Sequence, residues 1–127
     1  MSSNGWIGVD LDGTLAHYEG EQGVHHIGVP IPLMVGRVRK WLAEGKEVRI
    51  MTARVSGADS TDDVVRRDAE KARTCIKLWC SIVFGQVLAV THRKDFKMIE
   101  LWDDRVVRVE LNTGKVMSES EDRPCWE

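Results

Sequence analysis

The sequence lacks the features that mark several large classes of protein. No apolar run approaches the roughly 20 residues that span a bilayer, and the first residues show neither the basic nor the apolar segment of a secretory signal. Lys and Arg (18) do not outnumber Asp and Glu (20), so the net charge of -2 gives no sign of a basic surface for nucleic acid or of a polybasic membrane anchor. We therefore expect one cytoplasmic domain over residues 1–127.

Cysteine is also scarce. Cys75, Cys80 and Cys125 leave one thiol unpaired in any disulfide scheme, and the chain has neither a CxxC pair nor a Cys/His cluster with zinc spacing. We expect reduced thiols that pack as small apolar side chains.

What the sequence does contain is an alternation of strand and helix patterns. Short apolar runs predict strands at 6–10, 47–53, 87–91, 98–104 and 106–111. One helix is predicted from Pro32 to a C-cap at Gly45, and a second from a cap at Ser60 or Thr61 to Gly85. Between these elements we expect a flap at about 16–29, a loop at 55–61 and a polar tail at about 117–127. The alternation predicts an α/β sandwich around a mostly parallel sheet of five strands.

Polar residues gather where the predicted strands end. In parallel α/β sheets, ligands bind beyond the carboxyl ends of the strands. The residues at or just past these ends are Asp10 and Asp12, Thr52-Ala53-Arg54, Lys94, and Asp103-Asp104. Clustered carboxylates suit Mg²⁺, which takes oxygen ligands and recruits phosphate oxygens. A carboxylate can also attack phosphorus, a second one can transfer the proton, and a hydroxyl with an ammonium group can hold the phosphoryl oxygens.

The motifs "VDLDGTL", "IMTAR", a lysine and "LWDDR", in that order, resemble those of the haloacid dehalogenase (HAD) superfamily of phosphohydrolases. The resemblance covers roughly residues 5 to 110. The strand that ends in DxDGT is the specific part, whereas "TAR" and "DD" gain weight from their order. The resemblance implies a three-layer Rossmann-like sandwich, a flap after the first strand, and Mg²⁺-dependent phosphatase activity.

The resemblance also implies a role for each motif residue. Asp10 would be the nucleophile, and Asp12 the general acid and base, with its backbone carbonyl on the metal. Thr52, with its neighbours Ala53 and Arg54, and Gly13 would contact the substrate. Lys94 would steady the nucleophile and the transferring charge, with Lys97 as its rival in "RKDFK". Asp103 would bind Mg²⁺, with Asp104 beside it, directly or through water.

The chain leaves no room for the cap domain that larger members of the family carry. Its segments at the two usual insertion points are already assigned to the flap and to predicted elements. Capless members often act on phosphate carried by a large molecule, or use a neighbouring subunit as cover, so a homo-oligomer is one expectation. "TARVSG" and the terminal "CWE" also resemble the phosphatase half of phage polynucleotide kinases, which makes a polynucleotide end one candidate substrate.

Two other classes of function compete with a phosphatase. A response-regulator receiver also uses clustered Asp, a Thr and a Lys, but its acidic pair comes first and a lone phosphoacceptor Asp follows mid-chain. Here a DxD comes first and the acidic pair last. A non-catalytic phosphate-binding module on the same fold stays open. A P-loop kinase does not fit, because "EGKEV" lacks the GxxxxGK[ST] phosphate cradle.

Overall fold

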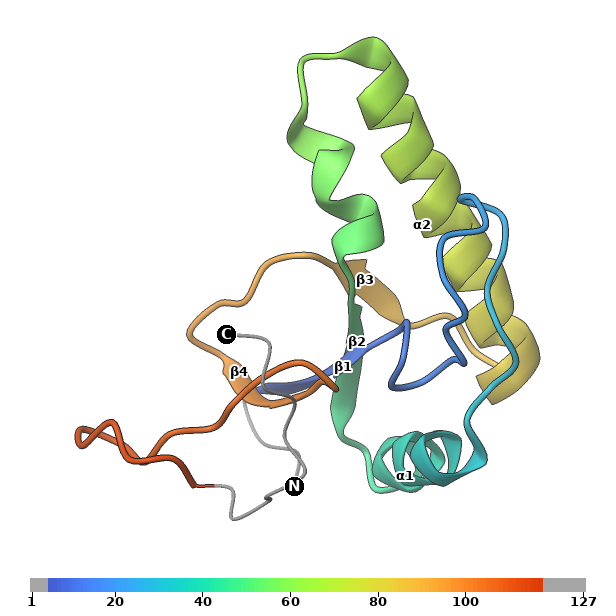
Figure 1. The fold of residues 1–127 in the computed structure, drawn as a ribbon. Coiled ribbons are helices and arrows are strands. Elements are labelled where there is room, and N and C mark those ends of the chain that lie inside the picture. Colours follow the sequence, from blue (N-terminus) through green and yellow to red (C-terminus); the bar gives the residue numbers. More distant parts are fainter. Residues whose placement is uncertain (1–4, 118–127) are drawn as a thin grey trace.

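The computed structural model describes residues 5–117 as an α/β fold built on a four-stranded, all-parallel sheet (Figure 1). The strands are β1 (Trp6–Asp10), β2 (Glu47–Met51), β3 (Ala89–Thr91) and β4 (Met98–Trp102), in the order β3-β2-β1-β4. The three helices are α1 (Pro32–Ala43), the 3-10 helix η1 (Ala53–Asp59) and α2 (Asp63–Phe84). The predicted strands and helices are thus confirmed, apart from the fifth strand.

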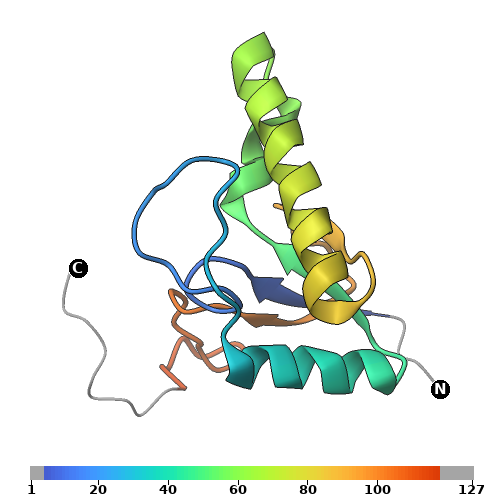
Figure 2. The same cartoon turned by 90° about the vertical axis from the view of Figure 1, so that its right-hand side faces the viewer.

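Both long helices pack on the same face of the sheet (Figure 2). Strands β1, β2 and β3 follow one another across the sheet in one direction, and right-handed connections then place both helices on one side. The core between them is apolar and contains Val9, Ile50 and Val90 from the strands, Val38 from α1 and Ile76 from α2. This burial holds the carboxyl ends of β1 and β2 in fixed positions.

The second face of the sheet carries no helix within residues 5–117, so the predicted third helical layer is not found there. Its cover is the connection 92–97, which runs from β3 past two strands to β4. That path spans three strand spacings of about 4.8 Å and returns along the sheet, while six extended residues reach about 20 Å. The connection is too short to include a helix. Asp95 fixes it on this face by accepting a 2.9 Å hydrogen bond from Nε1 of the buried Trp6.

Two predictions at the ends of elements were wrong. Residues 55–61 are mostly part of η1 and not a loop. A short 3-10 helix is held by i→i+3 hydrogen bonds and needs no periodic apolar residues, so the sequence contains no pattern that predicts it. Helix α2 is capped by Asp62, whose Oδ1 accepts from the backbone N–H groups of Val64 and Val65, and not by Ser60 or Thr61. It ends at Gly85 (φ 75°), as predicted.

The predicted fifth strand at 106–111 is not a strand. The segment pairs with no strand of the sheet, and Val109 makes only an isolated antiparallel bridge to Val116. Alternating valines indicate a strand by their pattern, but the pattern says nothing about whether a partner is present. Most of the predicted polar tail and Cys125 lie outside the described residues. Among those described, no helix is both long and apolar enough to cross a membrane.

Candidate functional site

The site begins where β1 ends in a tight loop. Asp10 is the last residue of β1, Leu11 is fully buried, and the backbone N–H groups of Leu15 and Ala16 both donate to the Leu11 carbonyl. Gly13 has a left-handed φ of 88°, and a Cβ there would lie 2.9 Å from Oδ2 of Asp104. Glycine is thus required twice, by its backbone conformation and by the close approach of a carboxylate.

Three carboxylates from two adjacent strand ends converge on one point. Oxygen atoms of Asp10, Asp103 and Asp104 all lie within 4.8 Å of one another. Asp10 ends β1, and the other two follow β4, which pairs with β1 in parallel register. Thr14 donates a 3.1 Å hydrogen bond to Asp104, and the backbone N–H of Arg105 donates at 2.8 Å to Asp103. The structure thus brings together three of the four residues predicted as metal ligands.

The convergence makes ionisation of Asp10 unfavourable. Burial is the largest cause, followed by the charge of Asp103 and then by a hydrogen bond and charge from Asp104, and together these raise the pKa of Asp10 to about 8. At neutral pH without a cation, the site therefore holds a proton that a divalent cation would displace.

This pKa predicts a pH-dependent stability of the metal-free protein. Asp10 binds its proton more tightly in the folded chain than in the unfolded one, where its pKa is 3.8. The free energy of unfolding should therefore fall as pH rises from about 4 to about 8, by about 1–3 kcal/mol once solvent screening is allowed for. Chemical denaturation with EDTA across this range measures it. Asp10→Asn should remove this contribution, and Asp68→Asn, an exposed change on α2, should keep it. Equal slopes in all three proteins would contradict the prediction.

Asp12 lies beside the triad but faces a different partner. Its carboxylate accepts two hydrogen bonds from Arg54, from Nε and from Nη2, both at 2.8 Å. The third guanidinium nitrogen, Nη1, is buried and has no hydrogen-bond partner among residues 5–117. Thr52, only 4% exposed, accepts a 3.1 Å hydrogen bond from the backbone N–H of Arg54 through its hydroxyl oxygen. The end of β2 thereby orders the cation that neutralises Asp12.

These groups line one open cavity of about 700 Å³. Among the predicted site residues, it includes Asp10, Asp12, Thr52, Ala53, Arg54, Asp103 and Asp104. The flap forms one wall through Tyr18 and residues 21–24. Gly13 does not line the cavity. Its missing side chain leaves the space that the carboxylate of Asp104 occupies.

Besides Gly13, the lysine is a predicted site residue that does not line the cavity. Lys94 and its rival Lys97 are both exposed in the connection 92–97, and neither lines the cavity. The cationic residues that do line it are Arg54 and Arg105, together with His92. Sequence inspection missed His92, although its place directly after β3 is the signal that selected the other strand-end residues. The role of either lysine stays a prediction.

The flap histidines do not line the cavity. His17 begins the flap, and its backbone N–H donates to the Val29 carbonyl at 2.8 Å, which closes the base of the flap. His25 turns towards α2, where its Nδ1 lies 3.3 Å from Sγ of Cys75. Both residues hold the flap in place and are exposed to solvent.

Comparison of the chain with protein-family models, with curated proteins and with solved structures gives no match. The residues of the site and their geometry are therefore what indicates a function.

Proposed function

We propose that the chain is a small, capless phosphatase of the HAD type, which hydrolyses phosphomonoesters with Mg²⁺ through an aspartyl-phosphate on Asp10. The observation that carries the proposal is the meeting of Asp10, the first residue of DxDGT, with Asp103 and Asp104 at the carboxyl edge of a parallel sheet. Thr52 and Arg54 stand at the same edge, in the same cavity. Residues from three motifs that are far apart in the sequence therefore lie together in one cavity.

The donor set fits Mg²⁺. All three clustered side chains offer carboxylate oxygens, the ligands that this hard cation prefers, and no nitrogen or sulfur ligand accompanies them in the described chain. Asp10, Asp103 and Asp104 would hold the ion, and the backbone carbonyl of Asp12 would be a further ligand. When bound, Mg²⁺ would offset the mutual repulsion of the carboxylates and draw negative charge from the phosphoryl oxygens.

The protein residues would then share two displacement steps. In the first, a carboxylate oxygen of Asp10 bonds to phosphorus, the bond from phosphorus to the leaving oxygen breaks, and Asp12 gives that oxygen a proton. In the second, Asp12 takes a proton from water, the water oxygen bonds to phosphorus, and the bond to Asp10 breaks. The Thr52 hydroxyl would hold a phosphoryl oxygen in both.

Arg54 would link substrate binding to the release of Asp12. In the free protein the guanidinium holds both carboxylate oxygens of Asp12, whereas the first step needs Asp12 to face the leaving oxygen. An arriving phosphoryl dianion would compete for the guanidinium, whose buried Nη1 has no hydrogen-bond partner within residues 5–117. Release from Arg54 would let the Asp12 side chain turn towards the leaving oxygen.

The resemblance assigns Asp103 as the direct metal ligand and leaves Asp104 direct or water-mediated. We therefore expect Asp103→Ala to weaken Mg²⁺ affinity more than Asp104→Ala does, by about tenfold or more. Calorimetric titration of the two variants with Mg²⁺ measures the ranking, with Asp63→Ala, at an exposed position in α2, as a control. An inverted ranking would exchange the two assignments.

The open cavity favours a phosphate on a large molecule, such as a polynucleotide end. With no cap domain in residues 5–117 and only the flap for cover, a small ester gains little binding energy remote from the phosphate. The test is a screen of phosphorylated metabolites and of 3′- and 5′-phosphorylated oligonucleotides, with Mg²⁺ and with EDTA. Release of phosphate that depends on Mg²⁺ supports the proposal, and its absence for every substrate favours a phosphate-binding module without turnover.

A further inference from the structure

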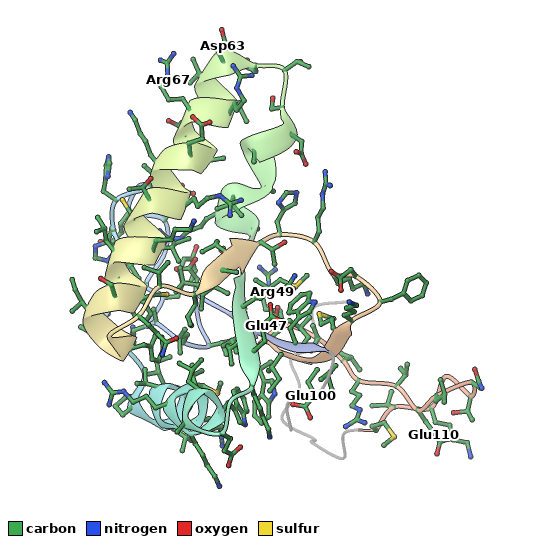
Figure 3. The ribbon with its side chains drawn as sticks, turned by 180° about the vertical axis from the view of Figure 1, so that it is seen from behind. Glu47, Arg49, Asp63, Arg67, Glu100 and Glu110 are labelled. Atoms are coloured by element: carbon green, nitrogen blue, oxygen red, sulfur yellow. The ribbon has the colours of Figure 1, made fainter. Side chains whose placement is uncertain are left out.

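Residues 105–117, here called the arm, leave the body of the molecule beside the site. The arm is a short antiparallel hairpin, in which the N–H of Glu110 donates to the Lys115 carbonyl at 2.7 Å and that of Met117 to the Arg108 carbonyl at 2.8 Å. The arm extends away from α1 and α2 (Figure 1). Glu110, near the end of the arm, lies far from Glu100 of β4 (Figure 3).

The arm carries several large apolar side chains, and yet none of them is buried. Every one of its residues is exposed. Six of its side chains are large hydrophobics that are each at least 44% exposed: Val106, Val107, Val109, Leu111, Val116 and Met117. Large apolar side chains that are exposed together on one short segment favour an interaction site.

Within residues 5–117, two further surfaces next to the arm are only partly covered. Strand β4 is an edge strand whose outer side pairs with no other strand in residues 5–117. The adjoining sheet face has the connection 92–97 as its cover, with Phe96 fully exposed and Ile99 54% exposed. Parallel sheets are normally buried on both faces, and open strand edges attract additional strands.

The arm cannot cover these surfaces in its own molecule. It starts three residues after β4, whereas parallel pairing with β4 would need a connection of about a dozen residues. An antiparallel return would need a tight turn at Asp103 and Asp104, and these residues instead hold their carboxylates beside Asp10.

We propose that a second copy of this chain supplies the cover, and that two copies exchange arms around a two-fold axis. Each arm would lie on the edge of β4 and on the exposed part of the second sheet face of the partner. A two-fold interface requires one surface that carries both halves of the contact, and here the arm and the open edge adjoin in the same chain. Residues 95–102 and 105–117 together give about 20 residues, close to the roughly 20–30 that each side of a standard interface contributes. Exposed Ile99 on β4 and Phe96 in the connection 92–97 offer apolar side chains to those of the arm.

Sedimentation of the full chain over a concentration series tests the proposal. The chain should sediment at twice its monomer mass, and Leu111→Asp should raise the dissociation constant about 100-fold. Ile82→Asp is the matched control, because Ile82 and Leu111 are both 83% exposed and Ile82 lies on α2. It should leave the dimer unchanged. A monomer at every concentration, or equal dissociation by both variants, would overturn the proposal.

Hydrogen exchange then locates the contact. On dilution through the dissociation range, the amides of residues 98–111 should lose protection while those of α2 should not. The melting temperature of Leu111→Asp at low concentration should equal that of the diluted wild-type chain, because Leu111 is exposed in the monomer. Loss of protection confined to another surface would show a dimer of a different kind and would refute arm exchange.

Discussion

Replacement of Asp10 by asparagine should lower kcat by about 10⁴-fold or more and leave the fold intact. An amide is not an anionic nucleophile, and it is a poor ligand for Mg²⁺ compared with a carboxylate. In the structure, the change also removes a carboxyl group whose ionisation is disfavoured by burial and by the neighbouring Asp103 and Asp104. The variant should thus be inactive and, without metal at pH 8, more stable than the wild type. Hydrolysis of p-nitrophenyl phosphate and chemical denaturation measure the two effects.

The joint outcome separates a catalytic role from a structural one. Replacement of a residue that only supports the fold would lower both the stability and the activity of the protein. Asp10→Asn is instead expected to raise the stability of the metal-free protein and to abolish its activity. Asp68→Asn, at an exposed site on α2, should change neither. Wild-type turnover by Asp10→Asn would remove Asp10 from the role of nucleophile.

The second large effect is expected at Asp12. Asp12→Asn should lower kcat by about 10²–10⁴-fold, because the variant can neither protonate the leaving oxygen nor activate water. With p-nitrophenol, a leaving group that needs little protonation, the first step should suffer less than the second. Phosphorylated enzyme should then accumulate, and a burst of p-nitrophenolate close to one equivalent should precede slow turnover.

The ion pair with Arg54 provides a check on this interpretation. Asparagine at position 12 keeps one acceptor oxygen but loses the charge that Arg54 contacts at 2.8 Å. If Asp12 served only to hold Arg54, then Arg54→Gln would reproduce both the loss of rate and the burst. Under the proposed mechanism, Arg54→Gln instead weakens phosphate binding, so its main effect should be a higher KM without a burst.

Most of the site could be predicted from the sequence, because its residues are brought together by the order and direction of the strands. An apolar run followed by DxDGT fixes the end of β1, and parallel strands bring their carboxyl ends to one edge. That rule needs no knowledge of side-chain packing, and it placed Asp10, Thr52 and Asp103 in one cavity. Contacts that depend on side-chain orientation could not be predicted. The pairing of Asp12 with Arg54 is the main example, since motif spacing does not show where a flexible guanidinium points.

The errors have a common physical cause. Residues 106–111 have the alternation of a strand, but whether they join a sheet depends on a partner edge and on the length of the connection to it. Lys94, whose role stays a prediction, lies outside the cavity lining for a related reason. The motif spacing of the family that the sequence resembles selects Lys94, whereas the short path of 92–97 across the second face decides where its side chain lies. Short-range patterns do not contain such long-range constraints.

The central claim is that a phosphoryl group is transferred to Asp10. The most direct measurement is the mass of the Asp12→Asn variant after incubation with p-nitrophenyl phosphate and Mg²⁺, quenching in acid, and digestion to peptides. We predict one added phosphoryl group on the peptide that contains Asp10, and none when Asp10→Asn is also present or when EDTA replaces Mg²⁺. A phosphoryl group on a different residue, or hydrolysis with no phosphorylated peptide in any quenched sample, would contradict the account.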